Sequence, residues 1–256
     1  MKFVVVAGAL LVMCSLAPTA EARSLDVIRE QGMIGQCAHP NALPFSSRKD
    51  EPPGFQIELG RAIGKQIGVV LQPIWIIGTN QMRRAGCDFV TDAIAVPNVQ
   101  DDTGLQLSKP YYRTGLVLAV RDGSPIAAAD AIDPHAKIGV MGSSVASMTF
   151  NQRGIRTSAF GFEDDMLKAL ADNEIDGAVV SRAGVGYFNV THPGRAFQMI
   201  DIAGLDPSFS WNVAIGVVKP DGKLRAAIDS ALDQLMADGT IKNIYAKYGI
   251  NLQPPN

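Results

Sequence analysis

Residues 107–122, Leu-Ser-Lys-Pro-Tyr-Tyr-Arg-Thr-Gly-Leu-Val-Leu-Ala-Val-Arg-Asp, are the stretch that decides the fold. Pro110 fixes a turn that carries two adjacent tyrosines, Tyr111 and Tyr112. The apolar run that follows has no helical period and ends at a charged pair. These features predict a buried strand over residues 116–121.

A second apolar run, residues 211–218, follows a long block of alternating segments. Two long strands that enclose an inserted block predict two lobes joined by a paired hinge. We expect lobe 1 to comprise residues 24–118 and 213–256, and lobe 2 residues 119–212. A cleft between such lobes is where a small ligand would bind.

Strand and helix patterns alternate along the whole chain, which predicts an α/β fold with parallel sheets covered on both faces. Gly68 ends a helix whose apolar residues recur at helical spacing from Phe55. Further strands are expected at 33–38, 69–75, 87–94, 137–141 and 175–180, and further helices near 79–86, 145–150, 166–171, 181–188, 224–235 and 241–248.

Ligands of such folds bind where the strands end at their carboxyl side and the loops converge. The turn Gly142-Ser143-Ser144 precedes a helix, so it either binds an anion or polar oxygen or provides only a helix cap at Ser144. The candidate cleft residues are Asn41, Phe45, Trp75, Asp101, Tyr111, Tyr112, Ser143, Ser144, Ser181 and Trp211.

The N-terminus has the pattern of a cleaved export signal. Met1-Lys2 is weakly basic, residues 3–16 are apolar, and Ala20-Glu21-Ala22 fits the small-residue cleavage motif. We expect residues 1–22 to be removed after Ala22 and the protein to act in the periplasm.

Export decides how the cysteines are interpreted, since Cys14 would leave with the signal and Cys37 and Cys87 would remain. Two cysteines in an oxidising compartment more often pair, and a disulfide closing a loop of about 50 residues would stabilise the fold by roughly 4 kcal/mol. Two free thiols or a metal pair remain alternatives. The three histidines lack metal-ligand spacing, and no metal or cofactor is expected.

The composition is that of an ordinary globular protein, with 47% hydrophobic and 19% charged residues and a formal net charge of −2. It lacks the basic clusters that would indicate nucleic-acid binding. No Gly-x-Ser-x-Gly, P-loop, Gly-x-Gly-x-x-Gly or His-Glu-x-x-His motif occurs, so we do not expect an enzyme.

The order of elements, Leu-Ser-Lys-Pro-Tyr-Tyr at 107–112 and Asp-Gly-Thr-Ile-Lys-Asn-Ile-Tyr-Ala-Lys-Tyr-Gly at 238–249 resemble the type II periplasmic solute-binding proteins of family 3. The likeness covers essentially the whole chain after the signal. It implies two α/β lobes, a two-strand hinge and closure on a ligand that is usually delivered to an ABC transporter.

Three shorter stretches resemble the MoxJ/XoxJ-type branch, whose members are associated with periplasmic quinoprotein methanol dehydrogenases. These are Cys-Ala-His-Pro-Asn-Ala-Leu-Pro-Phe-Ser at 37–46, Ala-Gly-Cys-Asp at 85–88 and Pro-Tyr-Tyr-Arg at 110–113.

The chain departs from the amino-acid receptors at two anchors. Residues 97–104 contain two aspartates where those receptors have the arginine that pairs with the ligand carboxylate, and Ser181 stands where an aspartate would hold the ligand ammonium. A zwitterion desolvated without these partners would be bound at a cost of several kcal/mol, on the order of that for a buried unpaired charge. We therefore do not expect ordinary α-amino acids as ligands.

Three functional hypotheses follow. The first is a monomeric periplasmic partner or accessory of a PQQ-dependent methanol dehydrogenase, contacted through an aromatic surface of Phe45, Trp75, Tyr111, Tyr112 and Trp211. The alternative for these rings is that they only pack the hinge and cores. The second is the receptor of an ABC importer for a small non-amino-acid solute. The third is a hydro-lyase on the same fold, with Asp101 or Asp102 as its acid or base.

Overall fold

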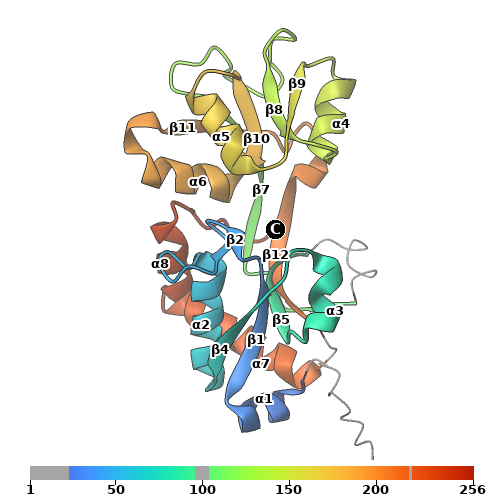
Figure 1. Cartoon of the computed structure of the whole chain (residues 1–256), viewed down its shortest axis with the longest axis vertical. Coiled ribbons are helices and arrows are strands. Elements are labelled where there is room, and N and C mark those ends of the chain that lie inside the picture. The colour runs from blue at the N-terminus through green and yellow to red at the C-terminus, as the bar shows by residue number, and fades with distance from the viewer. Residues whose placement is uncertain (1–22, 96–103, 219–220) are drawn as a thin grey trace, which may run out of the picture.

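The computed structural model describes residues 23–95, 104–218 and 221–256 and has an α/β fold with two lobes (Figure 1). The fold-class prediction is confirmed, whereas the expected signal, 1–22, lies outside the described residues.

The helices are α1 Leu25–Gln31, α2 Phe55–Ile67, α3 Met82–Ala85, α4 Val145–Gln152, α5 Glu163–Ala171, α6 Arg182–Thr191, α7 Gly222–Ala237 and α8 Thr240–Lys247. The strands are β1 Met33–Ala38, β2 Asn41–Ala42, β3 Ser46–Ser47, β4 Val70–Trp75, β5 Phe89–Ile94, β6 Gln106–Leu107, β7 Tyr112–Arg121, β8 Ile138–Met141, β9 Thr157–Phe160, β10 Gly177–Ser181, β11 Phe197–Asp201 and β12 Ser210–Val217. Short 3-10 turns cover Thr79–Gln81, Pro193–Arg195 and Pro207–Phe209.

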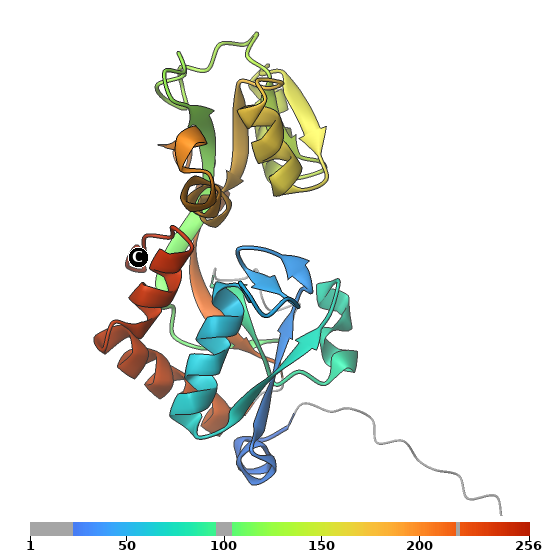
Figure 2. The same ribbon diagram turned by 60° about the vertical axis from the view of Figure 1, so that its left-hand side comes forward.

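Lobe 1 is built on strands in the order β4-β1-β5-β12, with β6 beside β12. Helix α2 covers this sheet because Phe55, Leu59 and Ile63 lie on one buried face, and Gly68, at a φ of 87°, ends it. In Figure 2 the red helices α7 and α8 lie on one side of the lobe 1 strands and the teal α3 on the other.

Lobe 2 has the order β7-β10-β8-β9, with β11 on the other side of β7. Helices α4, α5 and α6 cover it. Strands β9 and β11 were not expected from the sequence.

The two lobes are joined by β7 and β12, which pair antiparallel from Tyr112 opposite Val213 to Gly115 opposite Ser210. The hydrogen-bonded ladder runs through this crossing from β4 to β9, so the strands form one continuous path rather than two separate sheets. The exact lobe boundaries, at 118/119 and 212/213, remain a prediction.

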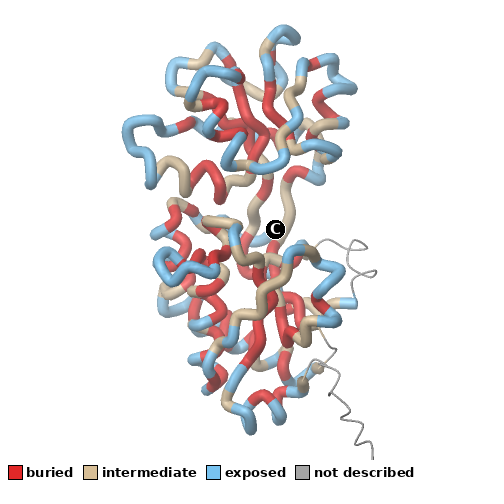
Figure 3. Tube along the Cα trace, in the orientation of Figure 1, coloured by how far each residue is buried: buried red, intermediate tan, exposed pale blue. Residues whose placement is uncertain are grey.

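The buried residues nevertheless divide into separate clusters on the two sides of the crossing (Figure 3). One cluster belongs almost entirely to lobe 1 and is centred on α2, α7 and α8. Two further clusters fill the two faces of the lobe 2 sheet. Each lobe therefore has its own hydrophobic core.

Strand directions bring the carboxyl ends of the parallel strands in both lobes toward the crossing. Strand β12 runs from lobe 2 into lobe 1 and is antiparallel to β5, so β5 and its parallel neighbours β1 and β4 end toward lobe 2. Strand β7 runs the opposite way and is antiparallel to β10, so β10 and β8 end toward lobe 1. Figure 1 shows the ends of β1 and β4 pointing to lobe 2.

The lobes also touch away from the hinge, where α6 meets the end of α8. A Cβ on Gly186 would lie 2.4 Å from the carbonyl oxygen of Gly249, and one on Gly249 would lie 2.2 Å from that of Gly186. Only glycine permits this close backbone approach. Beside it the rings of Tyr187 and Tyr248 lie 5.9 Å apart.

The C-terminal residues lie across the hinge. The Arg113 N–H donates to the Gln253 carbonyl oxygen at 2.9 Å, and the Asn256 N–H donates to Asn212 Oδ1 at 3.1 Å. Arg113 belongs to β7 and Asn212 to β12, so the chain end contacts both crossing strands.

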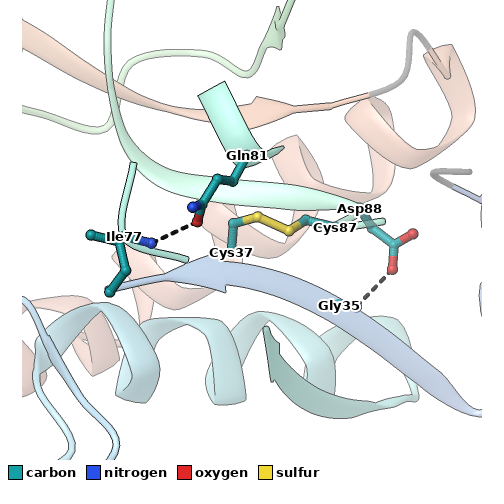
Figure 4. Close-up of a disulfide and its surroundings, with 6 residues drawn as sticks. All are labelled: Gly35, Cys37, Ile77, Gln81, Cys87 and Asp88. Atoms are coloured by element: carbon teal, nitrogen blue, oxygen red, sulfur yellow. Dashed lines mark hydrogen bonds between the residues drawn. A yellow bond between two sulfur atoms is a disulfide. The ribbon is translucent and has the colours of Figure 1, made fainter. Parts of the chain in front are cut away.

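Cys37 and Cys87 form a disulfide between β1 and the start of β5, with Cα atoms 5.4 Å apart (Figure 4). This confirms the predicted pairing. No helix among the described residues has the length and apolar character needed to cross a membrane.

Candidate ligand-binding site

A cavity of about 430 Å³ lies at the carboxyl ends of β1, β4 and β5 in lobe 1. Two other hollows, of about 410 and 480 Å³, adjoin Arg121 and Asp122 at the far end of lobe 2, away from the carboxyl ends of the parallel strands β8 and β10. The position of the lobe 1 cavity matches the place where open α/β sheets bind ligands. It is lined by Cys37, Ala38, His39, Gln56, Ile76, Ile77, Gly78, Thr79, Met82, Val90, Thr91, Asp92, Ala93, Ile94 and Leu105.

Asp92 is the one carboxylate in this lining, and a β-bulge positions it. Gly216 of β12 pairs with Val90 and Ala214 pairs with Ala93, so Thr91 and Asp92 together lie opposite the single residue between them. Asp92 has a φ of 54°, the left-handed conformation that aspartate tolerates better than most residues. Such bulges re-aim a side chain, here toward the base of β7.

Three donors converge on the Asp92 carboxylate. The hydroxyls of Tyr111 and Tyr112 each donate to Oδ1 at 3.1 Å, and Gln56 Nε2 donates to Oδ2 at 2.8 Å. The Tyr111 hydroxyl lies 2.9 Å from that of Tyr245, which can donate to it because Tyr111 gives its own proton to Asp92.

Burial raises the pKa of Asp92 above its ordinary value, although the hydrogen bonds from Gln56 and the two tyrosines oppose the rise. Burial, followed by the nearby Asp92 charge, raises the pKa of Tyr111 and of Tyr112 well above 10. The tyrosines therefore keep their protons and act as donors. No cation pairs with Asp92 among the described residues.

Tyr111 and Tyr112 are 4% and 3% exposed, which corrects the expectation that they form part of an exposed aromatic surface. Their rings pack with Tyr245 in the lobe 1 core, at 6.4 and 5.2 Å between centroids. The positions of the two rings agree with the alternative hypothesis, that they pack the hinge and the core.

The other aromatic candidates are half-buried. Phe45 packs on Phe55 with ring centroids 5.2 Å apart, and the Arg48 guanidinium lies 5.7 Å over the Trp75 ring. Trp211 lies on β12 opposite Thr114 and packs partly against the lobe 1 core.

Asn41 is exposed on β2, and its backbone N–H donates to His39 Nδ1 at 3.1 Å. His39 also lines the cavity, so Asn41 lies next to it. Asp101 lies outside the described residues, as does most of the arginine-free loop.

In lobe 2, Ser144 caps α4. Its hydroxyl accepts from the Ser147 N–H at 3.1 Å and donates to the Met141 carbonyl oxygen at 2.7 Å. Ser143 is exposed with a φ of 57°. The capping role of Ser144 is thus observed, whereas an anion-binding role for either serine stays a prediction.

Ser181 ends β10 and binds a carboxylate that the sequence reasoning missed. Its N–H and hydroxyl donate to Glu163 at 2.8 and 2.7 Å, and its hydroxyl also accepts from the Gly184 N–H at 3.0 Å. Burial raises the pKa of Glu163. Burial and then Asp165 raise the pKa of the neighbouring Asp164.

Glu163 places a carboxylate at the end of β10, where the sequence alone indicated only Ser181. The residue at position 181 is a serine, but the first residue of α5 brings a carboxylate to the same strand end. The run Phe-Glu-Asp-Asp at 162–165, one residue after the end of β9, is the sequence signal that could have indicated it.

Comparison with known proteins identifies the family. The model for "Bacterial extracellular solute-binding proteins, family 3" matches residues 34–251, so the chain belongs to this family. The structure of an ancestral cationic amino-acid solute-binding protein superposes with a TM-score of 0.72 at 20% identity, covering 88% of this chain and 99% of that one. At that identity the superposition shows the fold alone.

Two curated relatives cover nearly the whole chain. A protein described as a probable amino-acid-binding protein, from Bacillus subtilis, is 26% identical over 96% of this chain and 93% of its own length. The lysine/arginine/ornithine-binding periplasmic protein of Escherichia coli is 24% identical over 97% of each. Neither is named for a dehydrogenase system, so these findings do not show the narrower MoxJ/XoxJ likeness.

We predict that protonation of Asp92 stabilises the fold. Its pKa is raised in the folded protein, so the folded state binds the proton more tightly than the unfolded chain does. As the pH falls from about 7 to about 4.5, the wild type should gain stability relative to Asp92→Asn, which stays neutral. Urea unfolding of both proteins across this range measures the difference. A gap that stays constant or moves the other way would contradict the prediction.

Proposed function

We propose that this family 3 solute-binding protein binds a small solute through an amine or another cationic group, without a requirement for a carboxylate. The observation that carries the proposal is the half-buried Asp92 carboxylate at the cavity, hydrogen-bonded only to neutral donors.

The charge of the lining supports this ligand class. No lysine or arginine is among the described lining residues, and residues 96–103, whose structure is not described, contain none either. A ligand carboxylate would be desolvated near Asp92 without a countercharge, whereas an ammonium would supply the missing one.

Asp92 also retains capacity for a ligand. A carboxylate has about four acceptor positions, and three are used by Tyr111, Tyr112 and Gln56. The remaining lining is largely apolar, which suits an aliphatic chain next to the cationic group.

Lobe 2 would supply the second acidic group. Glu163 and Asp164 lie at the strand ends that point toward lobe 1. If the lobes close about β7 and β12, as the fold implies, a solute with two separated amines would be held by a carboxylate from each lobe.

The name of the Escherichia coli relative agrees with the cationic part of this proposal but not with the absence of a carboxylate. Lysine, arginine and ornithine carry a cationic side chain, which this site would accept, and an α-carboxylate, for which the described lining has no partner. Their decarboxylated counterparts, cadaverine, agmatine and putrescine, are therefore matched probes: each removes the carboxylate and keeps the chain.

We predict that at least one of these amines binds at least about tenfold more tightly than its parent amino acid, a difference of about 1.4 kcal/mol. Isothermal titration calorimetry on the six ligands measures it.

Asp92→Asn and Glu163→Gln should each weaken amine binding, whereas Asp233→Asn, an exposed residue paired with Lys109, should not. Amine affinity should also fall as the pH drops through the raised pKa values of Asp92 and Glu163, because protonation removes their charge. Micromolar binding of an amino acid with no binding of its amine would contradict the proposal.

The second candidate function is that of an accessory of a quinoprotein methanol dehydrogenase. In this role the protein would act on the dehydrogenase and would not deliver a solute to ABC importer membrane components. It is favoured by the MoxJ/XoxJ-like stretch at 37–46, whose end adjoins the exposed Arg48. Arg48 over Trp75 forms a cationic and aromatic pair of the kind enriched in protein interfaces.

For this candidate we predict that Arg48→Ala and Trp75→Ala weaken capture of the cognate dehydrogenase in a pull-down from native periplasm. Arg61→Ala, on the exposed face of α2, is the matched control. Tyr112→Ala is unsuitable because that ring is buried. Equal capture by all four proteins would move the interface elsewhere, and no capture by any would leave the solute receptor as the function.

A further inference from the structure

The buried carboxylate of Asp88 receives the first described residue of the chain. Asp88 is fully buried next to Cys87, at the entry to β5. The Gly35 N–H of β1 donates to its Oδ2 at 2.6 Å (Figure 4). Arg23 Nη2 donates to the same oxygen at 2.6 Å, and Arg23 Nε lies 3.3 Å from Oδ1.

The fourth contact comes from the backbone. The main-chain nitrogen of Arg23 lies 3.1 Å from Asp88 Oδ1. In an uncleaved chain this atom is an amide N–H. In a chain that begins at Arg23 it is an α-ammonium with a full positive charge.

Cleavage between Ala22 and Arg23 is already expected from the export signal. We propose that Asp88 is the acceptor for the N-terminus that this cleavage creates. Hydrolysis by an export-associated endopeptidase adds one water. The hydroxyl joins the Ala22 carbonyl carbon to give a carboxylic acid, which ionises, and the released Arg23 nitrogen becomes an ammonium. The small residues at 20 and 22 independently mark this bond.

The position of the cleaved bond determines where the charged nitrogen lies. Consecutive Cα atoms are about 3.8 Å apart, so each extra residue moves the first nitrogen of the chain by about that distance. A chain one residue longer would carry its charged nitrogen away from Asp88 and leave an amide in its place. Either donor makes a charge-assisted hydrogen bond to the Asp88 carboxylate, but only the ammonium adds a full positive charge and its Coulomb attraction. Correct cleavage therefore strengthens the link between the N-terminus, β1 and β5, the strands that carry Cys37 and Asp92.

Other charged groups lie near this contact. The Leu25 N–H donates to Asp221 at 2.7 Å, and Lys223 pairs with Asp26 at 2.7 Å. The Arg23 guanidinium also donates to Gln31 through Nη1. Among the ionisable groups in these contacts, only Asp88 contacts the Arg23 main-chain nitrogen.

The test compares two scarless chains, one that begins at Arg23 and one that begins at Ala22, each as wild type and as Asp88→Asn. NMR of the reductively methylated α-amine gives its pKa, and thermal unfolding between about pH 7 and about pH 10 gives the stability. In the Arg23 chain the α-amine should titrate about one pH unit above its ordinary value of roughly 8.

The stability of the Arg23 chain should depend on pH in the direction that a raised α-amine pKa implies. A group whose pKa is higher in the folded chain than in the unfolded chain stabilises the fold at pH values below its unfolded-state pKa. This stabilisation is lost as the pH rises through the folded-state pKa. The unfolding temperature of the Arg23 chain should therefore fall toward that of the Ala22 chain as the pH rises, and Asp88→Asn should remove the difference.

Equal α-amine pKa values in the two wild-type chains would overturn the proposal, and this comparison does not depend on whether Asp88→Asn folds. The mass of the protein exported by cells that express the full chain is the second measurement. A start at Arg23 supports the proposal, and a start at any other residue overturns it.

Discussion

The interaction on which the candidate site depends is the convergence of the Tyr111 and Tyr112 hydroxyls on Asp92. Tyr112 is the first residue of β7, and the Tyr111 N–H donates to the Val213 carbonyl oxygen of β12 at 2.9 Å. The carboxylate is thus tied to both hinge strands where they leave lobe 1. The left-handed backbone at Asp92 costs about 1 kcal/mol or more, and hydrogen bonds to a charged group, each worth about 1.5–3 kcal/mol, can offset it.

This arrangement links the candidate cavity to the hinge. The same carboxylate that lines the cavity holds the tyrosines at the base of β7, so a cation bound at Asp92, as proposed, would change the charge at the pivot. On the other side of the pivot, Ser181 and Glu163 place a second carboxylate at the end of β10. The close contact of Gly186 with Gly249 and the C-terminal residues across Arg113 and Asn212 constrain how the lobes can turn about these strands.

Much of this fold could be predicted from local patterns. Strand β1 matches its predicted bounds, and α2 ends where glycine permits a left-handed residue. The disulfide could be anticipated from the number of cysteines and the expected export. The edge strands β9 and β11 were missed because short strands of mixed composition give little periodic signal.

The site was harder to predict because it depends on contacts distant in sequence. Asp92 gains its role from a bulge that is set by the register of β5 against β12, more than 100 residues away along the chain. Glu163, the first residue of α5, gains its role by contacting Ser181 at the end of β10. Tyrosine is found both buried and exposed, so the sequence could not decide between an interface and a core for Tyr111 and Tyr112.

The most direct test of this account is a double-mutant cycle between Asp92 and Tyr112, measured as free energies of unfolding in urea. The variants are Asp92→Ala, Tyr112→Phe and their combination. A direct hydrogen bond to this half-buried carboxylate predicts a coupling energy of at least about 1 kcal/mol. Additivity within about 0.5 kcal/mol would contradict the claim that this contact holds the cavity and the hinge together.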